Sequence, residues 1–583
     1  MSIDLASLAA SVFAEIEFFV VCFWADDRRG HTFAPSDAFS IESGQHFWSV
    51  SSKHPVSGAG LVRKLGSGYL MFRGYELELG VHTNSGTSAL EHCASSDRFR
   101  NGCFAHIFVD DKKAELTARC DALGIAPLYH RTHDGCLFLA SHPILISRPT
   151  DEPDSLCWLA LLQQGSPLGD RSFYTEVKRL PMGSELIARR PGHTIRTWFD
   201  LNQFPDGTER IGESAFHRIE KVFQESVDRC LRIASAPSIL PLSSGYDSRR
   251  IFGALQRKRA DFVTFTAEGF AQKDGLLYEI DSVFAPNIAR AYGIEWALVR
   301  ASEAGDFAAD FAAREMLVGT ETFMHFWAVR VHRWLARQRP SLVWDGLGGD
   351  VFGYCGHVNL DLAETDTARL IEANRQIVLN NQTTPAIFGF LAESWPQLRD
   401  YRHACRETLG RFSHDLNQAE WGFFSPRTRR STGSWSVLMQ PPGQLLVFPY
   451  LDLAFVSESL RYHPQDKLRL HLQKECLNRF WPKLARFPGT NALPTDYRPI
   501  SRGRQAAYLN TVQDLIWKPL SNSTTLFRTL ELLSRRGRMH VRLASRVPLL
   551  RKRRSWFFDR FMELIGQDET QSPVAFASDR PSM

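Results

Sequence analysis

The chain has 583 residues, which is too long for one ordinary hydrophobic core and indicates roughly two to four domains. Its 44% hydrophobic and 23% charged residues are typical of a globular protein and exclude a fibrous or low-complexity chain. A net charge of +5 over this length favours no class of partner by itself.

The cysteines and the start of the chain bear on its compartment. Ten cysteines are scattered singly without a CxxC pair, so neither a zinc ribbon nor a thioredoxin-type redox site is indicated. With no secretory signal, we expect reduced thiols in a cytoplasmic protein. The apolar stretch LASLAASVFAEIEFFVVCFWADD contains Glu15 and Glu17, which interrupt a membrane span. We predict no membrane span, but a short helix followed by a buried strand.

The first 200 residues contain short β-branched and aromatic runs separated by Gly, Asn, Asp and Pro, which are typical of strands. The runs are FFVVCFWA, HFWSVSS, CFAHIFVDD, AELTARC and CLFLASH. They predict a layered, β-rich first domain over residues 1–205. The polar stretch DLNQFPDGTERIGES at 200–214 indicates a linker.

Beyond the linker, helical and strand-like patterns alternate. AFHRIEKVFQESVDRCLRIA and RRIFGALQRK predict helices, PSILPL and DFVTFTAEG predict strands, and VFAPNIARAYG predicts a helix capped by Gly293. This alternation predicts a parallel sheet with helices on both faces, whose ligands bind where strands turn into helices. We expect this α/β domain over 206–500, with 360–500 mostly helical.

The last segment, 501–583, is predicted to be a helical and basic extension. It contains RRGRMHVRLASRVPLLRKRR at 535–554, which has nine basic residues in twenty. An amphipathic helix with solvated arginines and a docking surface for a peptide both account for this basic arm.

Residues 242–248 read LSSGYDS and follow the strand-like run PSILPL. A phosphate-binding loop needs converging backbone N–H groups, a glycine, hydroxyl donors and a carboxylate for Mg²⁺. The residues that supply these groups are Ser243, Ser244, Gly245, Asp247 and Ser248. A capped turn, in which Asp247 or Ser248 starts a helix, accounts for the same pattern, so the motif alone leaves both interpretations open.

A second apolar run also enters a glycine-rich turn. It reads SLVWDGLGGDVFGY at 341–354 and carries Asp345 and Asp350. Two such loops at strand ends can bring two carboxylates to one metal–triphosphate complex, whereas a flexible glycine loop is the alternative.

These motifs together resemble the asparagine synthetase family of N-type ATP pyrophosphatases. LSSGYDS is similar to the family's S-G-G-x-D-S loop, DGLGGDVFGY to S-G-E-G-A-D-E-L-F-G-G-Y, and FPYLDLAF at 448–455 to P-F-L-D. GCFAHIFVDDKKAELTARCDALGIAPLYH, FLASHPIL and YTEVKRLPMGS resemble the second half of the family's glutaminase domain. The resemblance implies an α/β fold: an N-terminal Ntn-type αββα sandwich, then a parallel-sheet ATP pyrophosphatase domain with a helical C-terminal part.

The resemblance also implies ATP and Mg²⁺ as cofactors. Asp247 and Asp350 would be catalytic and bind Mg²⁺, and Lys474 is the candidate for a catalytic lysine. The residues that would bind the nucleotide are Leu242, Ser243, Ser244, Gly245, Asp247, Ser248, Phe265, Thr266 and Gly346. In this family a carboxylate attacks ATP to give an acyl-adenylate and pyrophosphate, and an amine then displaces AMP.

Other residues depart from the family. Its glutaminase uses a cysteine at the mature N-terminus, whereas here Cys22 lies inside an apolar strand, so we expect no ammonia production. Leu347 and Val351 replace two glutamates of the second loop. Phosphate-side residues are kept and substrate-side residues differ, as in the β-lactam synthetases and lasso-peptide cyclases that this chain resembles.

The favoured function is therefore an AMP-forming carbon–nitrogen ligase that closes a macrolactam in a lasso-type peptide. Its expected partners are a small peptide or amino-acid substrate and a leader-peptide-binding or protease protein. The alternatives are an asparagine synthetase, fed by ammonia or glutamine, and a non-catalytic ATP-binding scaffold. Because the chain has no CxxC pair and its basic residues are concentrated only in the short arm at 535–554, we expect no nucleic-acid partner.

Overall fold

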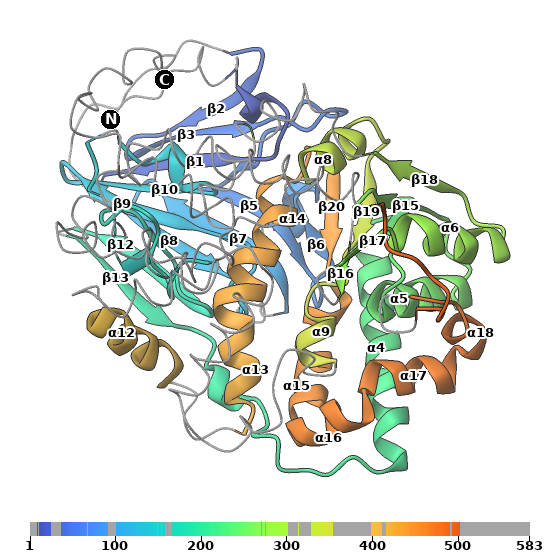
Figure 1. Ribbon diagram of the computed structural model, residues 1–583. Helices are drawn as coiled ribbons and strands as arrows, with labels where there is room; N and C mark the ends of the chain where they lie inside the picture. The colour runs from blue at the N-terminus through green and yellow to red at the C-terminus, as the bar shows by residue number, and fades with distance from the viewer. Residues whose placement is uncertain are drawn as a thin grey trace, which may run out of the picture.

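The computed structural model has two antiparallel sheets in its first half and a parallel sheet in its second half (Figure 1). Mixed α/β architecture was predicted, and this arrangement confirms it at that level. Apart from isolated positions and short pieces, the structure describes residues 11–24, 36–66, 68–90, 101–148, 166–190, 192–269, 276–300, 328–353, 398–410, 416–489 and 493–501. The basic arm at 535–554 lies outside the described residues.

The two antiparallel sheets contain thirteen strands, β1 to β13. One sheet has the strand order β11-β9-β10-β1-β3-β2, and the other has the order β13-β12-β8-β7-β5-β4 with β6 paired to β5. The strands are β1 (Phe19–Phe23), β2 (Phe39–Ser43), β3 (Phe47–Ser52), β4 (Val62–Leu65), β5 (Gly68–Glu76), β6 (Val81–His82), β7 (Gly102–Asp110), β8 (Glu115–Cys120), β9 (Tyr129–His133), β10 (Cys136–Ala140), β11 (Lys178–Arg179), β12 (Ser184–Arg189) and β13 (Gly192–Thr197).

The two antiparallel sheets pack face to face. Successive side chains of a strand point to opposite faces, so Phe19 and Val21 of β1 join a buried cluster with Met71 of the other sheet. Val20 and Cys22 join a second cluster on the opposite face. The short 3₁₀ turn η1 (Val12–Ala14) precedes this strand, which matches the prediction of a short helix before a buried strand. The helical layers of the expected αββα sandwich remain a prediction.

The parallel sheet has the strand order β18-β15-β14-β19-β20. Its strands are β14 (Ser238–Pro241), β15 (Phe262–Ala267), β18 (Trp296–Val299), β19 (Ser341–Trp344) and β20 (Gln444–Val447), and all their pairings are parallel. The chain starts at β14, moves outward through β15 and β18, and returns to place β19 on the other side of β14. This reversal is a topological switch point, which is where open α/β sheets bind their ligands.

Helices connect and extend the parallel sheet. They are α4 (Glu213–Ile233), α5 (Tyr246–Arg257), α6 (Asp281–Ala291), α8 (Ala328–Ala336), α9 (Gly349–Phe352), α12 (Leu398–Gly410), α13 (Gln418–Phe423), a π-helix (Phe424–Thr432), α14 (Gly433–Leu438), α15 (Leu453–Leu460), α16 (Pro464–Leu470), α17 (Leu472–Phe480) and α18 (Pro482–Ala485). A two-stranded hairpin, β16 (Ala271–Lys273) and β17 (Leu276–Tyr278), precedes α6. None of the described helices combines the length and hydrophobicity that are needed to cross a membrane.

Strand β20 is a short exception within residues 360–500, which were predicted to be mostly helical. The helices α12 to α18 agree with that prediction, but Gln444–Val447 forms the edge strand of the parallel sheet beside β19. The periodicity of so short an apolar run cannot separate a strand from a buried helical turn. The part of the predicted helical region at 360–397 lies outside the described residues.

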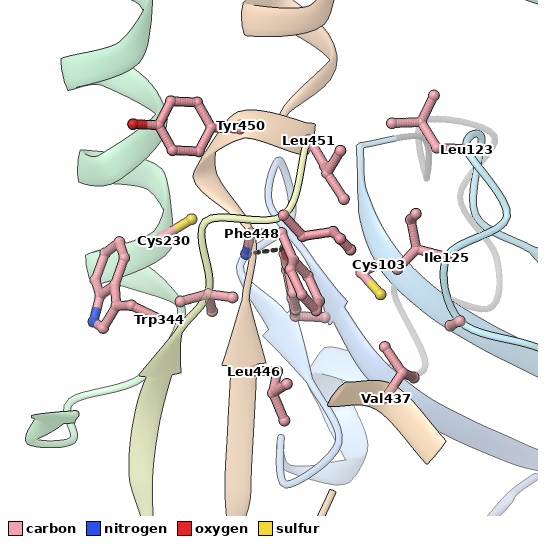
Figure 2. Close-up of a cluster of buried hydrophobic side chains, with 14 of the residues drawn as sticks. Cys103, Leu123, Ile125, Cys230, Trp344, Val437, Leu446, Phe448, Tyr450 and Leu451 are labelled. Carbon is pink, nitrogen blue, oxygen red and sulfur yellow. Dashed lines mark hydrogen bonds between the residues drawn. The ribbon is translucent and has the colours of Figure 1, made fainter. Parts of the chain in front are cut away.

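One buried hydrophobic cluster runs through both halves of the molecule. Figure 2 shows Cys103 and Ile125 of the first half near Leu446 of β20. The backbone N–H of Phe448 donates a hydrogen bond of 3.0 Å to the hydroxyl of Tyr75, which crosses from one half to the other (Figure 2). The two halves therefore share a core, and the division at 205/206 remains a prediction.

Asp452 of the FPYLD segment has a structural role. Its carboxylate accepts a hydrogen bond of 2.9 Å from the backbone N–H of Ala454 and so caps the first turn of α15. The same carboxylate accepts a hydrogen bond of 2.7 Å from Arg229 of α4. This side chain therefore joins two helices.

Candidate functional site

The loop after β14 and the loop after β19 lie side by side, because these two strands pair in parallel. Each loop leads into a helix, the first into α5 at Tyr246 and the second into α9 at Gly349. A Cβ atom on Gly349 would lie 2.5 Å from Cγ of Asp247, and one on Gly346 would lie 3.2 Å from its Cβ. Two glycines of the second loop therefore allow the Asp247 side chain to approach it.

Gly349→Ala is expected to disturb the contact between the two loops, because its methyl group would overlap the Asp247 carboxyl. We expect a lower melting temperature, corresponding to a loss of about 1–3 kcal/mol in the free energy of unfolding. Thermal unfolding would measure the effect. Gly192→Ala is the matched control, since a Cβ atom there meets no atom within 4 Å. An unchanged melting temperature in Gly349→Ala would contradict the close approach.

Serine hydroxyls hold the backbone of the first loop. Ser248 Oγ accepts a hydrogen bond of 3.1 Å from the Ser243 N–H and lies 2.9 Å from Ser243 Oγ. Ser243 Oγ in turn accepts a hydrogen bond of 3.1 Å from the Gly245 N–H. Gly245 has a φ of −74°, so this residue is needed for space beside Ser243 rather than for a left-handed backbone. Helix α5 begins at Tyr246 after Gly245, which makes no side-chain capping hydrogen bond, so neither Asp247 nor Ser248 caps this turn.

The donors of Ser244 converge on a single anionic oxygen. Its N–H and its hydroxyl donate hydrogen bonds of 2.7 and 2.6 Å to Oδ1 of Asp281, the first residue of α6. Charge-assisted hydrogen bonds of this kind are those that a phosphate oxygen also accepts. The sequence prediction did not include Asp281, which lies outside both motifs.

Three carboxylates, those of Asp247, Asp345 and Asp350, gather at the two loops. Burial and the neighbouring Asp350 carboxylate raise the pKa of Asp247 to about 8. Burial also raises the pKa of Asp345, whose carboxylate accepts a hydrogen bond of 2.8 Å from Ser436. Concentrated negative charge of this kind favours a bound cation.

The carboxylates do not form a complete metal site by themselves. Within the described ranges, no three His, Cys, Asp or Glu side chains are arranged to hold a metal ion. The oxygen donors of Asp247 and Asp350 nevertheless suit Mg²⁺, which usually takes one or two carboxylates and completes its shell with phosphate oxygens and water. The residues present therefore fit a magnesium–triphosphate complex.

Gln473 of α17 holds the Asp247 side chain. Its Nε2 donates a hydrogen bond of 2.8 Å to Asp247 Oδ1, and its Oε1 accepts one of 2.6 Å from Arg250. The hydroxyl of Tyr450 donates a hydrogen bond of 3.0 Å to the backbone carbonyl of Asp247. The predicted lysine, Lys474, is the next residue on α17 and is exposed. Gln473 was not predicted from the sequence. Tyr450 lies in the segment FPYLDLAF, which was compared with the family's P-F-L-D.

Phe265 and Thr266 of β15 are hydrogen-bonded to Leu242, at the start of the first loop. The carbonyl of Phe265 accepts a hydrogen bond of 2.7 Å from the Leu242 N–H, and the Thr266 hydroxyl donates one of 2.7 Å to the Leu242 carbonyl. The ring of Phe265 packs on Trp334, with centroids 4.7 Å apart. These contacts fix the start of the loop. Binding of a nucleotide by Phe265 and Thr266 remains a prediction.

Arg249 connects the first loop to the end of the helical region. Its guanidinium donates hydrogen bonds to the backbone carbonyls of Leu484, Phe487 and Pro488, at 3.2, 2.8 and 2.8 Å. It also donates to the carbonyl of Ser244. The side chain is buried, so these carbonyls compensate the charge that folding removes from water.

Cys22, the first cysteine of the chain, is buried in β1. Its hydrogen bond with Cys136 and its burial raise the pKa of its thiol far above the usual range. Because the thiolate is the reactive form of cysteine, this side chain is a poor nucleophile. The geometry agrees with the expectation that Cys22 is not a glutaminase nucleophile.

Arg73 of β5 is also buried. Its guanidinium donates a hydrogen bond of 3.1 Å to Glu17 and another to the backbone carbonyl of Val437 in α14. Burial raises the pKa of Glu17, and the Arg73 charge opposes that effect. Arg73 therefore takes part in the contact between the two halves.

Comparison with known proteins identifies part of the first half. Residues 79–199 match the family described as glutamine amidotransferase domain. No curated protein matches the chain. This region begins after Cys22 and contains β6 to β13, of which β7, β8 and β10 coincide with predicted strand-like runs.

Two solved structures are similar to this chain. One is described as the allosteric regulatory enzyme of purine biosynthesis, with 13% identity, 54% of this chain and 74% of that chain covered, and a TM-score of 0.22. The other is glutamine phosphoribosylpyrophosphate amidotransferase from B. subtilis complexed with ADP and GMP, with 12% identity, 59% and 72% covered, and a TM-score of 0.23. Scores this low carry no argument about the whole molecule. The match at 79–199 is what indicates an enzyme of amide chemistry, with a region of the glutamine amidotransferase type.

Proposed function

We propose that this protein is an ATP-dependent, AMP-forming carbon–nitrogen ligase. It would activate a carboxylate as an acyl-adenylate, release pyrophosphate, and join the acyl group to an amine. The observation that carries this proposal is the contact of two strand-end loops at the switch point of the parallel sheet, with Asp247 seated against Gly346 and Gly349. Hydroxyl donors, glycines and carboxylates are the groups that bind a metal–triphosphate complex.

The residues of the two loops have distinct parts in this reaction. Asp247 and Asp350 would hold Mg²⁺, which supplies charge neutralisation of the leaving pyrophosphate. The N–H and hydroxyl of Ser244, which donate to Asp281 in the structure, would exchange that carboxylate for a phosphate oxygen, supported by the positive end of the α5 dipole. Gln473 keeps the Asp247 carboxylate oriented.

The first half would act without producing ammonia. We assign residues 1–205 to an inactive amidotransferase-type domain, 206–500 to the ATP pyrophosphatase domain and 501–583 to a basic extension. Because Cys22 is a poor nucleophile, the first half would release no ammonia from glutamine. The amine that attacks the acyl-adenylate would then belong to the substrate itself. Macrolactam closure of a lasso-type peptide is the favoured version, assisted by a leader-peptide-binding or protease partner.

Incubation of the protein with Mg-ATP and peptides encoded beside its gene tests this proposal. We expect AMP formation together with the loss of one water from a peptide, read by mass spectrometry. Asparagine formed from aspartate and ammonia would instead favour an asparagine synthetase. Tight ATP binding without pyrophosphate release on any carboxylate would favour a scaffold, a result that the buried Leu347 and Val351 would then explain.

A further inference from the structure

A partly exposed arginine lies beside the second loop. Nη1 of Arg427 is 3.6 Å from Oδ2 of Asp350, and its guanidinium lies 4.6 Å from the ring centroid of Phe423. Its side chain is 17% exposed, whereas the residues on either side of it, Pro426 and Thr428, are buried. A cation over an aromatic ring has a restricted orientation, so Arg427 presents its charge in a fixed direction next to Asp350.

Arg427 belongs to the π-helix Phe424–Thr432, which is anchored to the first half of the chain. Arg429 forms an ion pair with Asp170. Arg430 donates a hydrogen bond of 2.8 Å to the carbonyl of Arg171 and another to that of Gly169. Long π-helices are rare, and π-helical turns are frequent at functional sites. Two buried arginines of one helix thus fix it to the amidotransferase-type half.

We propose that Arg427 binds the pyrophosphate portion of ATP, and that the first half positions it through the Asp170–Arg429 ion pair. This inference rests on the proposed function. The carboxylate of Asp350 and a triphosphate are both negative, so a cation near Asp350 reduces their repulsion. A guanidinium offers several N–H donors in a planar array that matches phosphate oxygens.

The proposal gives the first half a role that needs no nucleophilic cysteine. Residues 79–199 match the glutamine amidotransferase domain and include the segment that holds Arg429 and Arg430. A domain that no longer supplies ammonia would then still be needed, as a rigid support for a phosphate-binding residue. In that arrangement Asp170 is a positioning residue, which acts through Arg427.

The affinity for Mg-pyrophosphate, measured by isothermal titration calorimetry, tests the binding role. We expect about 10- to 100-fold weaker binding in Arg427→Ala and a smaller loss in Arg427→Lys, which keeps the charge but not the planar donors. Arg232→Ala, on the exposed last turn of α4, is the matched control and should bind as the wild type does. Wild-type affinity in Arg427→Ala would overturn the inference.

A double-mutant cycle tests the positioning role. Asp170→Asn is expected to weaken pyrophosphate binding in the wild-type background and to have no further effect in the Arg427→Ala background. An equal loss in both backgrounds would overturn the positioning role, because Asp170 would then act independently of Arg427.

Failure of the inference is distinguishable from failure of the proposed function, since pyrophosphate binding needs no turnover. Wild-type protein that binds pyrophosphate but catalyses no ATP–pyrophosphate exchange would overturn the proposed ligase function. The affinities of the Arg427 variants for pyrophosphate would still decide whether Arg427 binds it. Wild-type protein that does not bind pyrophosphate would overturn both.

Discussion

Asp247→Asn and Asp350→Asn are each expected to lower ATP–pyrophosphate exchange by about 10²–10³-fold. Each substitution keeps the shape of the side chain but removes a negative charge that would hold Mg²⁺ against the leaving pyrophosphate. The Asp247 carboxylate is oriented by Gln473 and lies against Gly349, so little rearrangement is available to replace it. Exchange of labelled pyrophosphate into ATP, measured with a candidate peptide substrate present, shows the effect.

Stability separates a catalytic from a structural role for Asp247. Burial and the Asp350 carboxylate disfavour its charged form, so Asp247→Asn should keep or raise the melting temperature while it lowers exchange. Asp261→Asn is the matched control, because that carboxylate is 83% exposed. Full exchange in both loop variants would contradict the assignment of the site, and a large drop in melting temperature would indicate a structural role instead.

The two loops could be predicted from the sequence because their signals are local. Each loop combines an apolar run with glycine, hydroxyl and carboxylate residues within about ten positions, and such runs become strands whose ends carry ligands. Their adjacency needed the strand order, in which β14 pairs with β19 although about a hundred residues separate them in the chain. The alternation of strands and helices made that pairing a reasonable expectation.

The supporting residues could not be predicted, because they come from distant segments. Gln473 contacts Asp247 across 226 positions, and Asp281 contacts Ser244 across 37. The choice between Gln473 and Lys474 depends on the rotation of α17. His471 has a φ of 45° and separates α16 from α17, so a helical period followed through this region loses its phase there.

In the first half too, local patterns could be predicted and distant contacts could not. Within the region that matches the amidotransferase family, β7, β8 and β10 carry clear β patterns and were predicted, whereas β9, β11, β12 and β13 were not. The burial of Cys22 followed from the apolar residues around it. The contacts that join Arg73 to Val437 and Arg429 to Asp170 connect the two halves across several hundred positions, and no local pattern announces them.

Lys467→Met is expected to destabilise the second half by about 3–5 kcal/mol. The ammonium of Lys467 lies 2.5 Å from Oε1 of Glu420, and both side chains are fully buried. It also donates a hydrogen bond of 3.0 Å to the carbonyl of Ser459. Removing the cation leaves a carboxylate buried without its counter-charge, which costs far more than loss of an exposed ion pair. This loss of stability would appear as a lower melting temperature and a lower midpoint of urea unfolding in Lys467→Met.

The double variant Lys467→Met/Glu420→Gln should recover most of this stability, because it removes the uncompensated charge. Lys221→Ala, which breaks an ion pair with Glu225 between two exposed side chains, should change the melting temperature little. Glu420 lies in α13, which continues directly into the π-helix that carries Arg427. Lys467→Met should therefore also weaken Mg-pyrophosphate binding, and the double variant should restore it. Recovery of stability without recovery of binding would mean that the charge of Glu420 itself, rather than the packing of α13, positions the π-helix.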